Sequence, residues 1–144
     1  VTSSIEDLKL IPASLDAALL TTAQREQQEM AAFHLARGRR LFEQEHNREA
    51  LTELRKAIYL SAYESEPHVL IGRIYVRTGR PREAIDAFRV ALWSQESAPV
   101  RLALAEALLQ AGDDALARTE AARALELDPA LAEAKALLAK IDKR

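Results

Sequence analysis

The chain of 144 residues contains no cysteine, which excludes disulfide bonds and thiolate metal sites and leaves cytoplasm and periplasm equally open. An excess of charge is missing too. The net charge is −2, whereas proteins that bind nucleic acids carry a strong basic excess, so nucleic acid is not an expected partner. No stretch approaches the roughly 20 consecutive apolar residues of a membrane span. We therefore expect a soluble chain that does not insert into a membrane directly.

Glycine and aromatic residues are scarce, with four glycines and an aromatic content of 5%. Hydrophobic residues make up 49% of the chain and charged residues 29%, which is typical of a helical globular protein and not of a disordered one. The first residue is Val1 and not methionine. A sequence that starts in this way is compatible with a piece of a larger or membrane-anchored protein.

Two stretches of eleven residues resemble each other at a distance of 34 positions. The first, REALTELRKAI, begins at Arg48, and the second, REAIDAFRVAL, begins at Arg82. A third copy follows 33 positions later, with Gly112 in the place of Gly79. A fixed period of this length indicates an array of stacked repeats.

Each copy is predicted to form two helices. Apolar residues recur at the i, i+3, i+4 and i+7 spacing of one helix face, as in the run from Ala84 to Leu92, and the alternation typical of strands is absent. Gly79 and Gly112 suit the left-handed residue that follows a helix. The expected helices span residues 22–45, 48–61, 67–78, 82–94, 99–110, 114–127 and 130–142.

Small residues recur where the two helices of one copy would cross. Helix axes approach to roughly 8 Å only where the crossing residues have almost no side chain. Tyr75, Phe88 and Leu108 are expected to fill the space beside the crossings. The small residues are Gly38, Gly72, Ala105, Ala50, Ala84 and Ala117.

The second copy resembles the tetratricopeptide repeat, on the pattern Gly72, Tyr75, Gly79, Ala84, Phe88 and Ala91. The first copy departs from that pattern, with Arg37 where a leucine is usual and Glu45 in place of the turn glycine. The third copy has Ala121 in the aromatic place. The resemblance covers roughly residues 31–144.

This resemblance implies an all-α fold, a right-handed superhelical solenoid of antiparallel helix hairpins. Residues 22–131 would form three hairpins, at 31–64, 65–97 and 98–131, and residues 132–144 a capping helix. Residues 1–21 form an N-terminal segment with a short helix capped by Ser14, and Thr21 would start the long first helix.

For function, the resemblance implies protein binding through the concave surface lined by the first helix of each hairpin. That groove would be apolar with a basic stripe, suited to a protein or peptide that is apolar with an acidic flank. The predicted groove residues are Leu35, Arg39, Phe42, Val69, Arg73, Val76, Arg77, Leu102, Glu106 and Leu109. The Lys/Asn/Arg clamp of members that grip chaperone tails is replaced here by Leu35, Arg39 and Leu70, so such an adaptor is not expected.

Simpler explanations exist for these groups. Leu35, Val69 and Leu102 would also suit a partly buried inner helix face. Arg39 and Arg73 could also be solvated side chains that pair with Glu43 or Glu66 and bind no partner. His34 and His68, which share one place in the repeat, are expected to be packing residues and not metal ligands.

No catalytic residue, metal or cofactor is expected. The stretch GRIYVRTGR, from Gly72 to Arg80, lacks the Gly-Lys-Ser/Thr ending of a phosphate-binding loop, and neither HExxH nor GxSxG occurs. Three functions stay open: a non-enzymatic interaction scaffold, which leads; a homo-oligomer formed through the N-terminal segment or the first hairpin; and a secretion-type chaperone that holds apolar client segments.

The N-terminal segment has two alternative roles. Residues 1–30 carry five acids and two bases, so an acidic apolar tail adjoins a basic groove. The tail could occupy the groove as a competitor, because tethering raises its effective concentration. Alternatively, it would cap the array by covering Met30 and Phe33.

Overall fold

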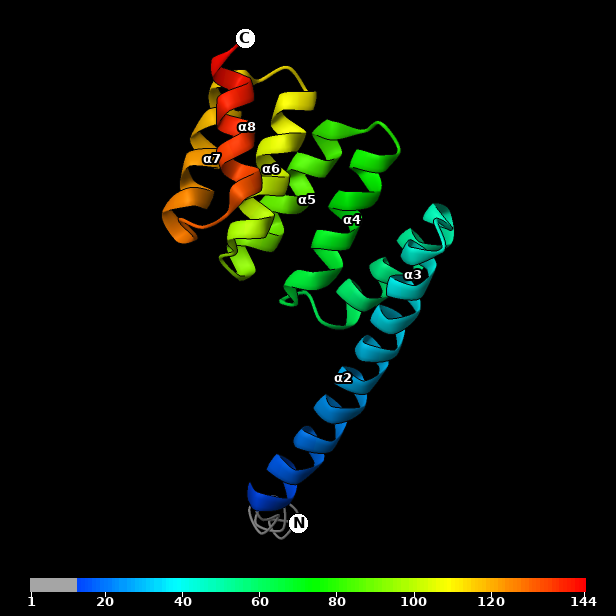
Figure 1. Cartoon of the computed structure of the whole chain (residues 1–144). Helices are drawn as coiled ribbons and strands as arrows, with labels where there is room; N and C mark the ends of the chain where they lie inside the picture. The colour runs from blue at the N-terminus through cyan, green and yellow to red at the C-terminus, as the bar shows by residue number, and fades with distance from the viewer. Residues whose placement is uncertain (1–12) are drawn as a thin grey trace, which may run out of the picture.

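The computed structural model describes residues 13–144, and every regular element in that range is an α helix. The bounds are α2 (Ala13–Glu43), α3 (Asn47–Leu60), α4 (Ser65–Arg77), α5 (Pro81–Ser94), α6 (Ala98–Gln110), α7 (Asp114–Leu127) and α8 (Ala132–Asp142). Figure 1 shows the helices stacked side by side from α2 to α8. The predicted all-α solenoid is confirmed.

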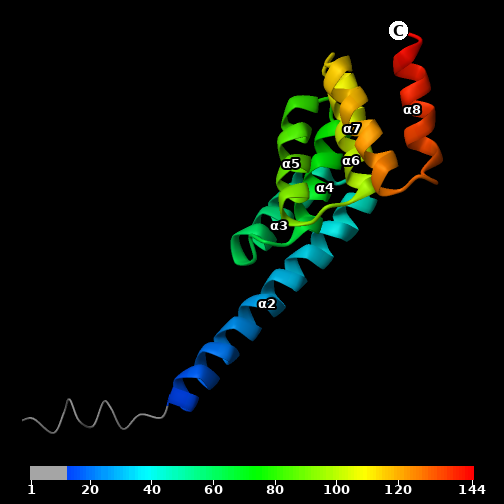
Figure 2. The same cartoon turned by 90° about the vertical axis from the view of Figure 1, so that its left-hand side faces the viewer.

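Successive helices pair as hairpins: α2 with α3, α4 with α5, and α6 with α7. The first helices of the hairpins also touch one another, since α4 contacts both α2 and α6. Helix α8 packs on α7 and α6, as Figure 2 shows from the side. The surface formed by α2, α4 and α6 is therefore continuous along the array.

Glycine allows the two helices to approach closely where they cross in the first and second hairpins. A Cβ atom on Gly38 would lie 2.7 Å from a side-chain carbon of Leu54, and one on Gly72 would lie 2.5 Å from the ring of Phe88. Phe88 and Leu54 are themselves fully buried. The predicted close approach at these small residues is confirmed.

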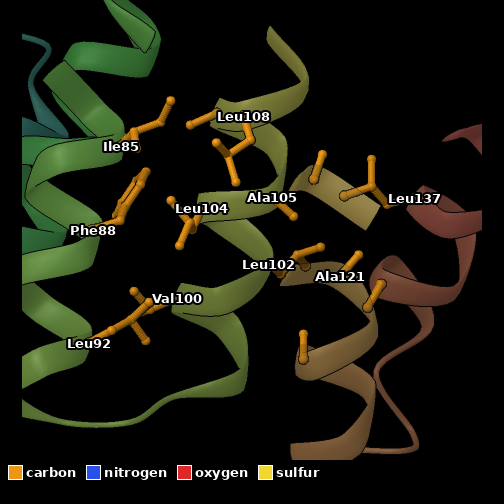
Figure 3. Packing of buried hydrophobic residues seen from close by; sticks show 14 of the residues in the cluster. Ile85, Phe88, Leu92, Val100, Leu102, Leu104, Ala105, Leu108, Ala121 and Leu137 are labelled. Atoms are coloured by element: carbon orange, nitrogen blue, oxygen red, sulfur yellow. The ribbon is translucent and has the colours of Figure 1, made fainter. Parts of the chain in front are cut away.

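Two clusters of buried side chains hold the array together. The smaller joins the first hairpin to the second, and the larger extends from α5 to α8, where Ala134, Leu137 and Ile141 complete it. Figure 3 shows Phe88, Leu104 and Leu137 within the larger cluster. Tyr75 packs against both clusters and so links them.

Each first helix ends in the same turn. Gly79 and Gly112 have φ values of 77° and 88°, in the left-handed region, as predicted. In each of these turns the next residue donates a backbone hydrogen bond back to the last helical turn, Arg80 to Tyr75 at 2.7 Å and Asp113 to Leu108 at 2.9 Å. Glu45 holds the same place in the first hairpin with φ of 61°, a conformation that favours glycine.

The N-terminal boundary differs from the prediction. We expected a short helix before residue 22 and a new helix from Thr21, and this is wrong: α2 runs without a break from Ala13 to Glu43. Residues 13–30 contain no glycine or proline and many good helix formers, which outweigh a local capping pattern. Residues 13–21 do not cover Met30 or Phe33, which stay half exposed. What we predicted for residues 1–12 lies outside the described residues.

The turn at Glu45 generates a stability prediction. Replacing Glu45 with glycine should raise the free energy of unfolding by about 0.5–1 kcal/mol, because the left-handed strain of a residue with a Cβ atom is removed. Chemical denaturation measures the change. The matched control is Gly79→Ala, which meets no atom within 4 Å and should lower stability by about 1 kcal/mol through backbone strain alone. A loss of stability in Glu45→Gly would contradict the proposed turn strain.

The crossing at Gly72 generates a second prediction. Gly72→Ala should cost about 1–3 kcal/mol, because the added Cβ collides with the Phe88 ring. Phe88→Leu should also destabilise by leaving a cavity. The double variant should lose less than the sum of the two by more than about 0.5 kcal/mol, since the leucine makes room for the methyl group. Additive losses in denaturation would show that the two positions do not share one contact.

Candidate functional site

The predicted groove residues lie on α2, α4 and α6, the helices that form one continuous surface. The structure brings five of them together around a pocket of about 340 Å³ between α4, α6 and α8, here called the central pocket. Its lining residues are Arg73, Val76, Arg77, Phe88, Pro99, Leu102, Ala103, Glu106 and Glu133. This pocket contains more of the predicted groove residues than any other pocket along that surface.

Two of the other predicted residues, Leu35 and Leu109, line hollows toward the two ends of that surface, whereas Arg39, Phe42 and Val69 line none of these pockets. Leu35 lines a pocket of about 130 Å³ between the first hairpin and the start of α4, where Pro67 is also found. Leu109 lines a shallow hollow of about 720 Å³ together with Lys140 and Arg144, and Glu106 stands between this hollow and the central pocket. The groove is thus a row of three depressions.

Arg77 is held in place by the first hairpin. It donates hydrogen bonds to the backbone oxygen of Phe42 at 3.1 Å and to Oδ1 of Asn47 at 2.7 Å. Its guanidinium also lies 4.3 Å from the centre of the Phe42 ring. Arg77 and Phe42 therefore join two hairpins, and little of their binding capacity is left for a ligand. The sequence reasoning missed the part played by Asn47.

Arg39 is paired as well. Its Nη2 atom lies 2.7 Å from Oε1 of Glu66, and both side chains are about half exposed, at 45% and 46%. The pairing with Glu66, one of the two simpler explanations of Arg39, is confirmed. An exposed pair of this kind contributes little to stability, but it neutralises the cation that the predicted basic stripe required at this place.

Arg73 remains as the available cation of the stripe. It is exposed on α4, and within residues 13–144 it makes no hydrogen bond or ion pair. Across the central pocket stands Glu106, whose pKa is raised above its ordinary value by partial burial first and by the nearby Glu133 next, while Arg73 and Lys140 act in the opposite direction. The pocket therefore has a free cation on α4 and two neighbouring carboxylates on α6 and α8.

The apolar residues of the predicted groove are less exposed than the sequence indicates. Leu102 is only 6% exposed and belongs to the larger core cluster, as Figure 3 shows. Val69, Val76 and Leu109 are partly buried and pack against the same cluster. Only parts of these side chains face the pocket, because they pack against the core cluster. Glu133, which α8 brings to the pocket, carries no signal in the repeat pattern.

His34 and His68 lie outside the groove pockets. His34 Nδ1 is 2.6 Å from Oε2 of Glu53, a buried carboxylate that also receives a hydrogen bond from Lys56 at 3.4 Å. His68 is partly buried, its Nε2 atom has no hydrogen-bond partner among the described residues, and burial lowers its pKa. Nowhere in residues 13–144 do three His, Asp or Glu side chains gather as a metal site would require.

The length and apolar character of the helices bear on membrane insertion. None of the described helices combines the length and the apolar character needed to cross a bilayer, the long α2 included.

Solved structures share this fold. The first repeat domain of Spaghetti (RPAP3), bound to the HSP90 peptide SRMEEVD, matches with a TM-score of 0.77 at 21% identity, over 81% of this chain and 93% of that chain. YrrB, a repeat protein with an unusual peptide-binding site, matches with a TM-score of 0.74 at 25% identity, over 84% of this chain and 63% of its own. The translocator chaperone SycD of Yersinia enterocolitica type III secretion, in an alternative dimer, matches with a TM-score of 0.74 at 17% identity, over 79% and 92%.

In sequence, no curated protein matches the chain. The family model of the tetratricopeptide repeat, in contrast, matches residues 35–99 and again residues 69–132. The two matches overlap and together cover more than half of the chain, and they include the turns and crossings described above. The chain therefore belongs to the tetratricopeptide repeat family.

Proposed function

We propose that this protein is a non-enzymatic interaction scaffold that binds a peptide or a helix of a partner protein along the surface of α2, α4 and α6. The observation that carries the proposal is the central pocket with the unpaired Arg73 on its edge. The peptides held by RPAP3 and the peptide-binding site of YrrB, on similar folds, support the same general function.

The size of the central pocket favours an anchoring side chain over a whole small molecule. Its volume of about 340 Å³ lies at the lower end of the roughly 300–1,000 Å³ of small-molecule sites. Val76, Pro99 and Ala103 supply apolar lining. A large apolar side chain of the partner would fill this space and displace water from it.

Charges around the pocket give the bound peptide a direction. Arg73 would pair with an acidic residue next to the apolar anchor, since its guanidinium has no competing partner. Glu106 and Glu133 lie close enough to repel each other, which adds to the effect of burial in raising the pKa of Glu106, and they would repel a second acid. The partner segment should therefore carry its acidic residue on the α4 side and a neutral or basic residue on the α8 side.

Binding, and not catalysis, fits the lining of this pocket. It contains no serine, threonine, cysteine, histidine, lysine or tyrosine, so the carboxylates of Glu106 and Glu133 are its only side chains of the types that act as nucleophiles or general bases. Glu106 has a shifted pKa but, apart from Glu133, no such neighbour in the pocket to act with.

A secretion-type chaperone is the weaker candidate. Its support is the fold similarity to SycD, and holding a long apolar client would need a broad apolar surface. The burial of Leu102 and the paired state of Arg39 leave a narrower and more polar surface than that role requires.

Selection from a library of random twelve-residue peptides tests the proposal. We expect the selected peptides to share a large apolar residue beside an aspartate or glutamate. Arg73→Glu should weaken the binding of such a peptide by at least about tenfold, measured by fluorescence polarisation, because the acidic residue would face a like charge. Val76→Asp should weaken it as well.

The matched control is Arg89→Glu, which makes the same charge change on an exposed arginine of α5 outside the central pocket. It should leave affinity within about twofold. Peptides that bind equally well to the Arg73→Glu variant would show that the central pocket is not the site. A failure to enrich any sequence would contradict peptide binding itself.

The carboxylates near the site generate a prediction on pH. Because the pKa of Glu106 is raised in the folded protein, its charge opposes folding at neutral pH, and this opposition disappears as pH falls toward the ordinary value of 4.5. Glu106→Gln should therefore be more stable than the wild type at pH 7.5 and equal to it near pH 4.

Glu53 is the control with the opposite sign. The hydrogen bond from His34 keeps the pKa of Glu53 below 4.5, against the effect of burial. Its charge therefore stabilises the fold above that pH and loses this effect as pH falls through the lowered pKa. Glu53→Gln should be less stable at pH 7.5, with a difference that shrinks in acid. Equal pH profiles in denaturation for the two variants would contradict both assignments.

A further inference from the structure

Helix α2 is far longer than the helix that it packs on. It has 31 residues against 14 in α3, and α3 ends where Gln27 Nε2 donates a hydrogen bond to the Leu60 oxygen at 2.7 Å. Residues 13–26 therefore extend beyond the hairpin by about 20 Å at ~1.5 Å per residue. Both views show this part of α2 standing away from the other described helices (Figures 1 and 2).

One side of α2 carries an apolar stripe at coiled-coil spacing. Leu19, Ala23, Glu26, Met30 and Phe33 follow one another at alternating steps of four and three residues. The large members are exposed, Leu19 by 62%, Met30 by 50% and Phe33 by 51%. The stripe begins on the projecting part and continues over the first hairpin.

This stripe lies on the side of α2 that faces away from the rest of the array. Phe33 and Arg37 hold the repeat positions of Pro67 and Ile71, which in α4 are buried against the first hairpin. In α4 this face is covered by the preceding hairpin. The matching face of α2 is therefore a surface on which a helix can pack. A further repeat hairpin packed on this face would bury the charge of Arg37, at a large desolvation cost. A single helix that packs nearer the N-terminus of α2 avoids that cost and is the better occupant.

We propose that this helix is α2 of a second copy, and that two chains form an antiparallel dimer through residues 19–33. With the twofold axis at Glu26, Leu19 of one copy faces Phe33 of the other, and Ala23 faces Met30. Leu19 then packs against the Phe33 ring of the other copy, and the small Ala23 leaves room for Met30.

Charge at the twofold axis supports the second copy as the occupant. Arg25 and Glu26 are adjacent, exposed, and without an ion pair among residues 13–144. In the antiparallel arrangement Arg25 of each copy lies beside Glu26 of the other, so two reciprocal pairs form and separate the two Glu26 carboxylates. The contact uses about 15 residues per copy, fewer than the roughly 20–30 of a standard interface, so a dissociation constant of about 1–100 µM is expected.

The mass of the chain in solution is the first test. Sedimentation equilibrium from about 1 to 500 µM, which brackets that range, should show a monomer–dimer equilibrium. Met30→Glu with Phe33→Glu should weaken dimerisation at least tenfold, with unchanged helical content by circular dichroism. Trp93→Glu, which places the same charge on an exposed aromatic residue of α5, is the matched control and should still dimerise. A monomer throughout the concentration range overturns the proposal.

Cross-linking tests the orientation, and the lack of native cysteine makes it direct. Leu19→Cys alone and Phe33→Cys alone should give little disulfide-linked dimer, whereas an equimolar mixture of the two should give it efficiently. Glu26→Cys should link to itself. Strong self-linking of Leu19→Cys with none in the mixture would show a parallel pair and overturn the antiparallel dimer.

A charge reversal completes the test. Arg25→Glu should weaken the dimer, because two like-charge contacts replace the two ion pairs at the axis, and adding Glu26→Arg in the same chain should restore it. Both changes lie on the exposed projecting part, so folding of the hairpins should not be affected. No change of the dissociation constant in Arg25→Glu would contradict the reciprocal pairs and with them the assigned axis.

Discussion

The whole array depends on how closely two helices can approach at one point in each hairpin. At Gly38 and Gly72 the facing side chains, Leu54 and Phe88, occupy the space in which a Cβ atom would lie. A larger residue at either glycine would push the hairpin open. Because the next hairpin packs on the resulting surface, the spacing of α2, α4 and α6 is set by these two contacts, and the central pocket depends on that spacing.

The same surface serves for packing and for binding, and most of its charged and aromatic groups are already engaged. Arg77 joins the second hairpin to Phe42 and Asn47 of the first, and Arg39 is neutralised by Glu66. Arg73 forms no ion pair with any described residue, although it lies near enough to Glu106 to lower the pKa of that carboxyl. Specificity in the proposed scaffold therefore comes from one unpaired cation beside an apolar pocket, with the carboxylates of α6 and α8 on its far side.

The sequence predicted the hairpins, the crossings and the turns because each has a local chemical signature that recurs with the repeat, such as Gly79 and its counterpart Gly112. It did not predict what depends on neighbours outside the repeat. Glu133 reaches the pocket from α8, and Leu102 is buried in the cluster that α8 completes. The continuity of α2 was missed for a different reason, since a short capping pattern at Thr21 was given more weight than the helix propensity of the whole segment.

Because α2 is long, a small rotation of the first hairpin would displace the N-terminal end of this helix by a large distance. Ala13 lies about 37 Å from the crossing at Gly38, at ~1.5 Å per residue. A rotation of the hairpin by about 10° about that crossing would move Ala13 by roughly 6 Å, while Phe42, four residues from the crossing, would shift by only about 1 Å. Small adjustments between the first two hairpins, which the smaller core cluster joins, are thus enlarged several-fold at the far end of the rod.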